Sequence, residues 1–256
     1  MRPRSKYRRR PQPSIFVILI AMLAFLCLPA LLAFAHAQTV PQTKRSQAAV
    51  AAATAPVKMA LDERGLKLGN PVFLQITKQP AELTAYVQDA EGIFQPFRTW
   101  PVCSVSGGLG PKLREGDLQA PEGFYKVKPD QMNPASSYHL AFNLGYPNAF
   151  DRAHDRTGSF LMVHGSCASV GCFAMTDAVI EEVWTLMQAA FEGGQSAVDV
   201  HIFPFPMTQA NLAAHQTNVH AAFWQSLTPA WEQFVVTGKV PGVRVAGKTY
   251  QVRSVQ

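Results

Sequence analysis

The pattern of apolar and polar positions predicts β-structure over much of the chain beyond residue 70. Apolar and polar residues alternate through three consecutive runs, at residues 72–77, 82–88 and 94–102. The breaks between these runs, Lys-Gln-Pro and Asp-Ala-Glu-Gly, are turn-forming sequences, so the three runs predict a meander of strands. Shorter apolar runs predict three further strands, at residues 123–127, 159–163 and 198–203.

Helical periodicity appears in two later segments. Residues 176–194 carry apolar side chains on one helical face, with Thr176 or Asp177 able to cap the N-terminus and Gly193 suited to the C-terminal end. A second helical region is expected from Gln209 to about Phe234. Together the elements predict a mainly β fold with flanking helices, of the α+β class, with a helical appendage at the C-terminal end.

The first 37 residues have the layout of a secretory signal peptide. The basic start MRPRSKYRRR precedes an apolar run from Ile15 to Ala35, and Ala35-His36-Ala37 supplies small residues before a cleavage site. The apolar run, roughly 20 residues, is also long enough to remain as an uncleaved membrane anchor. Both alternatives predict export to the periplasm or cell envelope, with membrane contact only through an uncleaved signal.

The remainder of the chain divides by composition. Residues 38–57 are small, Ala-rich and without apolar periodicity, so they are expected to form a flexible linker. Residues 58–205 are predicted to form one domain with a sizeable core, and residues 206–256 the helical appendage.

The charge balance argues against a nucleic-acid partner. The chain has 23 Lys and Arg residues, of which six lie in residues 1–37, leaving 17 against 17 Asp and Glu residues that all lie beyond them. The formal net charge of +6 is therefore confined to the predicted signal, and the rest of the chain is neutral. A neutral chain gives no support to polyanion binding.

The stretch HGSCASVGC, residues 164–172, concentrates three chemically active side chains. His164, Cys167 and Cys172 could supply three ligands of a zinc site, with Cys103 or a distant histidine as the fourth, although the spacing is not a usual one. A Cys167–Cys172 disulfide is the second alternative. Only three cysteines follow residue 37, so at least one of them has no disulfide partner within the chain. An unpaired thiol in an exported protein indicates a specific role for that cysteine.

A cysteine nucleophile is the third alternative and supplies such a role. A histidine at the end of one strand beside a cysteine on the following turn gives a base next to a thiol. Gly171 allows a backbone N–H to face a developing oxyanion, and the helix that begins near Thr176 could favour the thiolate. A catalytic Cys172 is accordingly expected to be alkylated fastest, and to react even below the ordinary thiol pKa of about 8.5. Cys103 and Cys167 are then expected either to pair with each other or to stay buried.

The sequence SVGCFAM, with an upstream His-Gly that ends a strand, resembles the signature of the L,D-transpeptidase catalytic-domain (YkuD-type) family. The family's usual form is His-Gly followed by Ser-His-Gly-Cys-apolar-Arg. The resemblance is strongest to a YafK-like branch, which is similar also in GPKLREGDLQAPEGFY, MNPASSYHLAFNLGYPNAFDRAH and VHIFPF. It covers roughly residues 61–234 and implies a mostly β catalytic domain of the sandwich or barrel kind.

The resemblance also implies roles for individual residues. Cys172 would be the nucleophile, His164 the general base and acid, and Gly165 the residue whose carbonyl orients the imidazole. Backbone N–H groups around Gly171 and Cys172 would hold the oxyanion. Two positions depart from the family pattern, because Val170 replaces a histidine and Ala174 an arginine.

The implied activity is cysteine acyl transfer at meso-diaminopimelate in the stem peptides of peptidoglycan, with no metal and no organic cofactor. Because Val170 and Ala174 alter the cleft, hydrolysis is an alternative, either as an L,D-carboxypeptidase or as an amidase that releases a murein-linked group such as a linked protein. A non-catalytic murein-binding protein remains a further alternative.

Other polar residues are expected to have structural roles first. His139 is expected to be a satisfied strand residue rather than a second base. Charged residues of the long loop, Arg114, Glu115 and Asp117, and of the turn at Arg152, His154 and Arg156 are candidate substrate contacts. No role in chemistry is expected for His215 or His220.

Overall fold

The structure, a computed structural model, describes residues 39–253 of the chain. These residues belong to one compact unit. The predicted signal segment, residues 1–37, lies outside the described residues. Among residues 39–253, none of the helices combines the length and the hydropathy that crossing a membrane requires.

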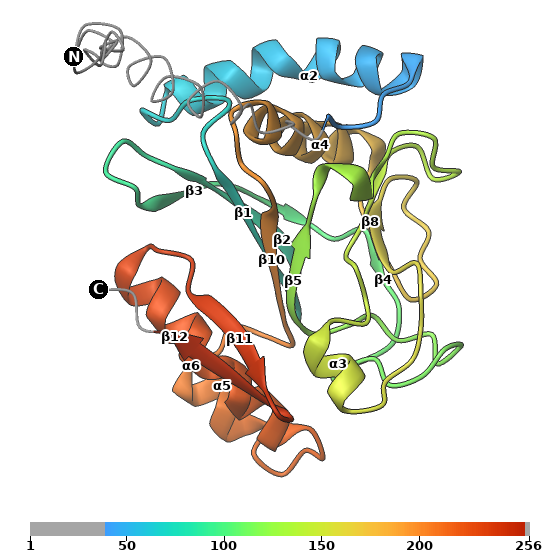
Figure 1. The fold of residues 1–256 in the computed structure, drawn as a ribbon, viewed down its shortest axis with the longest axis vertical. Coiled ribbons are helices and arrows are strands. Elements are labelled where there is room, and N and C mark those ends of the chain that lie inside the picture. Colours follow the sequence, from blue (N-terminus) through green and yellow to red (C-terminus); the bar gives the residue numbers. More distant parts are fainter. Residues whose placement is uncertain (1–38, 254–256) are drawn as a thin grey trace, which may run out of the picture. The chain divides into compact units, whose positions relative to one another are not determined.

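The first sheet contains the predicted meander and has the strand order β3-β2-β1-β10-β5 (Figure 1). Its strands are β1 (Val72–Lys78), β2 (Ala81–Gln88), β3 (Phe94–Pro101), β5 (Gly123–Val127) and β10 (Val198–Phe203). Every residue of β1 is buried, since β1 is central and pairs with β2 antiparallel and β10 parallel. The five predicted strands in this sheet are confirmed.

The second sheet is smaller and has the order β4-β9-β8-β7-β6. Its strands are β4 (Ser104–Val105), β6 (Met132–Asn133), β7 (Ala141–Asn143), β8 (Met162–His164) and β9 (Phe173–Ala174). Both sheets keep free edges, so neither closes into a barrel. Mixed sheets with several helices confirm the α+β class.

One predicted strand is shorter than expected. The run at residues 159–163 becomes strand only at Met162, where β8 begins. Gly158 and Phe160 have φ angles of +143° and +53°, which an extended strand does not allow. The strand nevertheless ends at His164, as predicted.

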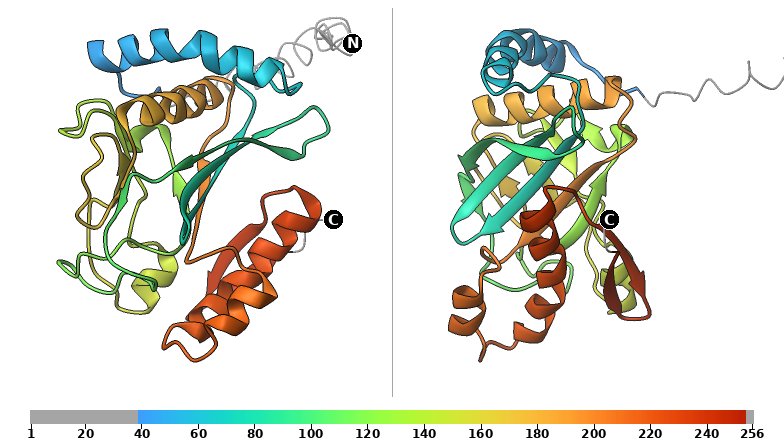
Figure 2. Two further views of the ribbon diagram at one scale, coloured as in Figure 1. Left: turned by 180° about the vertical axis from the view of Figure 1, so that it is seen from behind. Right: turned by 90° about the vertical axis from the view of Figure 1, so that its left-hand side faces the viewer.

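The predicted flexible linker is wrong, because most of residues 38–57 lie in helix α2 (Lys44–Asp62). Thr43 caps this helix through a reciprocal hydrogen-bonded box with Ser46. A stripe at intervals of four residues is buried, and it consists of Ala49, Ala53, Val57 and Leu61. Small side chains let α2 pack closely against α4. The two helices lie next to each other in both views of Figure 2. The alanine-rich composition, which predicts a flexible linker, instead provides the small side chains with which α2 packs.

Helix α4 (Asp177–Glu192) confirms the predicted amphipathic helix in detail. Thr176 caps it by accepting a hydrogen bond from the Val179 N–H, and Gly193 follows its last turn. Trp184 is fully buried at the face that packs into the core. The shorter elements between the strands are η2 (Pro129–Gln131) and α3 (Ala149–Ala153).

The C-terminal segment contains helices and also a β-hairpin, which the predicted helical appendage lacked. Its elements are α5 (Gln209–Ala214), α6 (Ala221–Thr237), β11 (Gly242–Ala246) and β12 (Thr249–Arg253). The buried Trp224 of α6 donates its indole N–H to Glu122 at 2.8 Å. Glu122 also forms a buried ion pair with Lys78 at 3.1 Å, which ties α6 to the first sheet.

Candidate active site

The parallel pair β8 and β9 brings the two predicted catalytic residues together. His164 is the last residue of β8, and Cys172 directly precedes β9. The register places Val163 opposite Phe173 and His164 opposite Ala174. Cys172 thus lies beside the start of β8, where the Met162 N–H donates to its Sγ at 3.4 Å. The two residues, eight positions apart in sequence, therefore lie on neighbouring strands.

The imidazole of His164 is held by its own chain. Its side chain is buried, and Nδ1 lies 2.6 Å from the carbonyl oxygen of Gly165. A carbonyl oxygen only accepts, so this contact requires the proton on Nδ1 and leaves Nε2 as the basic nitrogen. The ring of Tyr138 packs against the imidazole with centroids 4.6 Å apart.

Gly165 occupies a position that has no room for a side chain. A Cβ atom there would lie 2.5 Å from Oδ1 of Asp177 and 3.1 Å from the carbonyl oxygen of Tyr138. Its N–H is shared between the carbonyl oxygens of Tyr138 and Leu140, both at 3.1 Å. On the other side of its carbonyl, the Ser166 N–H donates to Oδ1 of Asp177 at 2.8 Å, so the peptide that contacts His164 is held at both ends.

A tight turn formed by residues 169–172 carries the thiol. The Ser169 hydroxyl donates to the Cys172 carbonyl at 2.6 Å and accepts from the Cys172 N–H at 3.1 Å. Gly171 has a φ of +86°, a conformation that favours glycine. Of the two N–H groups expected to face an oxyanion, that of Cys172 is already engaged. The N–H of buried Gly171 has no acceptor among residues 39–253.

The environment of the thiol differs from the expected one. Burial raises the pKa of Cys172 above its ordinary value, and the Met162 N–H and the charge of Lys112 oppose that shift only in part. Burial also lowers the pKa of His164, against the opposing effect of its hydrogen bond to Gly165. The expectation of a lowered thiol pKa is therefore wrong, and the two groups rest as a neutral thiol and a neutral imidazole.

The disulfide excludes two of the three alternatives for the cysteines. Cys103 and Cys167 are bonded to each other, with Cα atoms 5.3 Å apart, and Cys172 is a free thiol. Cys167 is thus available neither for a bridge to Cys172 nor for a zinc site with His164. No group of three or more potential metal ligands occurs within residues 39–253. The bridge holds the start of the 165–172 loop beside β4.

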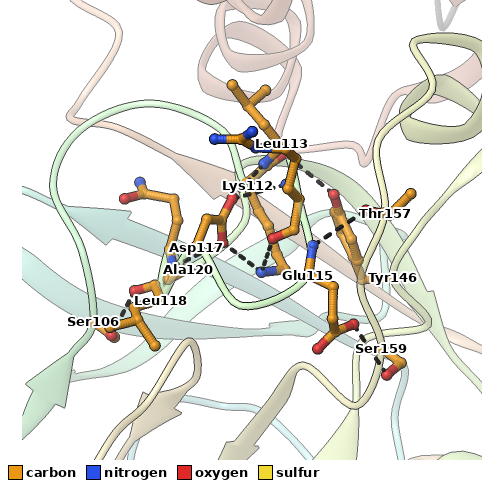
Figure 3. A network of polar contacts seen from close by, with 12 residues as sticks. Ser106, Lys112, Leu113, Glu115, Asp117, Leu118, Ala120, Tyr146, Thr157 and Ser159 are labelled. Atoms are coloured by element: carbon orange, nitrogen blue, oxygen red, sulfur yellow. Dashed lines mark hydrogen bonds and ion pairs between the residues drawn. The ribbon is translucent and has the colours of Figure 1, made fainter.

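Lys112, which sequence reasoning missed, organises the long loop beside the thiol (Figure 3). Its side chain is buried, and Nζ donates to Oδ1 of Asp117 at 2.5 Å and to the Arg114 carbonyl at 2.8 Å. Burial alone would raise the pKa of Asp117, but hydrogen bonds from Lys112 and from backbone N–H groups outweigh it and hold the pKa at about 2. Asp117 therefore has a structural role in the loop. The spacing of five residues between Lys112 and Asp117 is the feature of the sequence that could have indicated their ion pair.

The same network reaches the segment that precedes β8. The Glu115 N–H donates to the Thr157 hydroxyl at 3.2 Å, and the Ser159 hydroxyl lies 3.4 Å from the Glu115 carboxylate (Figure 3). The next residue, Phe160, has its carbonyl oxygen 3.8 Å from Sγ of Cys172. The long loop thus supports one wall around the thiol.

The other polar candidates have mainly structural contacts. Nε2 of His139 lies 2.7 Å from a Glu181 carboxylate oxygen, so the residue is satisfied as expected, although it lies in a turn with φ of +62° rather than in a strand. Arg156 pairs with buried Asp151 at 2.9 Å, and His154 contacts the Lys248 carbonyl at 2.8 Å. His215 packs on Phe205, away from the thiol.

Comparison with known proteins identifies this arrangement. The YkuD family, described as L,D-transpeptidase catalytic domain, matches residues 73–202. The chain belongs to the L,D-transpeptidase family. It is 44% identical over 185 residues to YafK of Escherichia coli K12, covering 72% of this chain and 75% of that protein. YafK of Escherichia coli O157:H7 gives the same values.

Two solved structures are also similar. The helical cell shape determining protein Pgp2 from Campylobacter jejuni shares 22% identity with a TM-score of 0.44, over 69% of this chain and 64% of that one. Bd1075 of Bdellovibrio bacteriovorus shares 19% identity with a TM-score of 0.38, over 65% of this chain and 60% of that one. The chain thus spans less than two thirds of the length of either structure.

The two departures from the L,D-transpeptidase pattern lie in different environments. Val170 is 72% exposed at the tip of the turn that carries the thiol. Ala174 is fully buried in β9 opposite His164. Because paired residues of neighbouring strands point to the same face, a longer side chain at position 174 would project on the His164 side of the sheet. This chain therefore lacks a cationic side chain at that position.

Proposed function

We propose that this protein is an exported cysteine acyl transferase that acts at meso-diaminopimelate in the stem peptides of peptidoglycan. The observation that carries the proposal is the site itself, where a free Cys172 thiol lies beside the strand that ends at His164. Membership of the L,D-transpeptidase family supports peptidoglycan as the substrate class. The location in the periplasm or cell envelope follows from that substrate.

In the proposed first step, Nε2 of His164 takes the proton of the Cys172 thiol as the sulfur attacks the meso-diaminopimelate carbonyl. Burial favours the neutral forms of both Cys172 and His164, so the proton is transferred from the thiol to the imidazole as the sulfur attacks. The N–H of Gly171 has no partner in the described chain and is the donor offered to the oxyanion. As the carbon–nitrogen bond breaks, His164 returns the proton to the leaving amine, and a thioester to Cys172 remains.

The second step releases the acyl group and restores the thiol. An acceptor amine, or water, attacks the thioester while His164 removes its proton, and the sulfur leaves as thiolate and is reprotonated. Exposed Val170 and buried Ala174 replace two polar residues of the family pattern beside this site. Fewer polar groups are available to hold an amine, which favours water as acceptor and hence carboxypeptidase or amidase chemistry as the second candidate.

Mass spectrometry of muropeptides after incubation with the purified protein tests both versions. Transpeptidation would replace the mass of the leaving amine with that of the acceptor amine, whereas hydrolysis would shorten a stem peptide or release a linked group. Cys172→Ala protein is the matched control. Equal product formation by that variant would show that another site does the chemistry, and binding without any product would favour a non-catalytic murein-binding protein.

A further inference from the structure

A second cavity lies away from the thiol, between the free edge of the first sheet and the C-terminal hairpin. It has a volume of about 550 Å³ and is lined by residues of β5, β10, α3 and β11, and by Tyr250 of β12. None of the residues assigned to the candidate active site lines it. The long loop around Lys112 does not reach it either.

The cavity gathers positive charge. Four cationic side chains line it, namely Lys126, Lys128, Arg152 and Arg244. Its one acidic side chain is Asp199, which pairs with Lys126 at 2.6 Å while the Lys126 side chain stays 63% exposed. Beyond residue 37 the sequence is formally neutral, so four cations around one carboxylate are a local concentration. Such an excess favours a ligand with more than one negative charge.

Two edge strands, β5 and β11, form walls of the cavity. Strand β5 is at the edge of its sheet, and the carbonyl of Phe124 accepts from the Asn148 side chain at 2.9 Å, on the side away from β10. Two residues on, Lys126 has the same orientation, because backbone directions alternate along a strand. Gly145 lies beside the Lys126 carbonyl, where a Cβ atom added to the glycine would be 3.9 Å from the oxygen, so the loop after β7 borders this edge of β5. On the facing wall, β11 pairs with β12 in a two-stranded sheet.

We propose that this cavity binds a second, non-reacting stem peptide of peptidoglycan, an inference that rests on the proposed function. A stem peptide that ends at meso-diaminopimelate presents two carboxylates and one ammonium at that end. The four cations match the carboxylates, and Asp199 matches the ammonium. The peptide would lie in the cavity between β5 and β11, beside the exposed side chain of Lys126. Binding there would hold the enzyme on the wall while Cys172 acts on another stem.

The test is an NMR titration of the Cys172→Ala protein with a synthetic stem peptide that ends at meso-diaminopimelate. The amides of Gln131 and Val245, which border the cavity, are expected to shift with the peptide. In a variant with Lys126→Gln, Lys128→Gln and Arg244→Gln, these shifts should require at least a tenfold higher peptide concentration. The matched control removes three exposed charges elsewhere, Lys44→Gln, Lys58→Gln and Lys67→Gln, and should titrate like the parent.

Three outcomes would overturn the proposal. One is the absence of peptide-induced shifts at these amides, and another is equal affinity in the cavity variant with its melting temperature preserved. The third is a response to inorganic phosphate without a response to the peptide, which would make the cavity a phosphate site. Failure of the proposed function is a separate result, because it appears as lack of Cys172-dependent product whatever the cavity amides do.

Discussion

The Nδ1 atom of His164 lies 2.6 Å from the carbonyl oxygen of the very next residue, Gly165. This contact sets the imidazole tautomer without an acidic partner, because a backbone carbonyl accepts the Nδ1 proton and leaves Nε2 basic. The carbonyl is fixed in turn by a residue that has no space for a side chain. The orientation of the base therefore depends on main chain and glycine rather than on a carboxylate.

Replacement of the nucleophile tests the assignment most directly. Cys172→Ala is expected to abolish turnover, because the thiol is free and lies at the head of β9. The folded state should persist, since the alanine keeps the backbone of the 169–172 turn. Muropeptide product analysis and the melting temperature measure the two effects. Activity near the parent level would refute the assignment.

Replacement of the base should lower the rate by about 10²–10⁴-fold in His164→Ala, the usual range for a lost proton-transfer group. Burial lowers the pKa of His164 from its ordinary value of 6.5, so the neutral, active form persists as pH falls through 6.5. The acid limb of kcat/KM is therefore expected below pH 6.5 in the parent protein and absent in the variant. An acid limb unchanged by the substitution would assign it to another group.

Thiol reactivity gives an independent pH test. Burial raises the pKa of Cys172 above the ordinary value for a thiol, so its thiolate is scarce at neutral pH. The rate of iodoacetamide alkylation at Cys172 should still be rising at pH 9, later than for an unperturbed thiol in a model peptide. Peptide mapping of the labelled site provides the measurement. A plateau below pH 8 would instead indicate a stabilised thiolate.

The disulfide is expected to stabilise the fold. Cys103 and Cys167 close a loop with a sequence separation of 64, and loss of such a bridge costs about 2–5 kcal/mol. Double replacement, Cys103→Ser with Cys167→Ser, should lower the free energy of unfolding by this amount in urea titrations. Reductant should lower the stability of the parent protein similarly and leave the double variant unaffected.

His201 predicts a loss of stability in acid. The imidazole is buried among aromatic rings, with Phe73 and Phe124 centroids at 4.8 and 4.7 Å, and burial lowers its pKa to about 3. Between pH 6.5 and 3 this histidine binds a proton in the unfolded chain but not in the folded chain. The free energy of unfolding therefore falls as the pH falls, by at most about 1.4 kcal/mol per pH unit from this residue. Urea titrations of His201→Phe should lack this part of the slope, while the parent keeps it.

Sequence patterns identified the strands with strong alternation and the helix with clear caps. The strand at Val198 and the helix that begins at Asp177 agree with the structure because local periodicity and burial coincide there. The strands β4, β6 and β9 have two residues each, which is too short to show an alternation of apolar and polar positions. They are defined by their pairing with neighbouring strands of the second sheet. Helix α2 was missed because alanine contributes little to an apolar pattern, although its four-residue stripe is buried.

The site was predictable to the extent that it lies in one short segment. His164, Gly165, Gly171 and Cys172 fall within nine residues, and strands β8 and β9, which carry the two ends of this segment, are neighbours in one sheet. Lys112 comes from a distant loop, and nothing local marks it as a neighbour of the thiol. The direction of the thiol pKa was also unpredictable, since burial follows from packing that the sequence does not display.

The link from Trp224 through Glu122 to Lys78 makes the C-terminal helix part of the support for the loop beside the thiol. Lys78 also donates to the carbonyls of Gly110 and Ala120, which lie on either side of the Lys112–Asp117 contact in that loop. A change in α6 that displaced the indole would leave a buried carboxylate short of a donor and loosen the loop. Substitutions in α6, far along the chain, are thereby constrained by the loop that lies beside the Cys172 thiol.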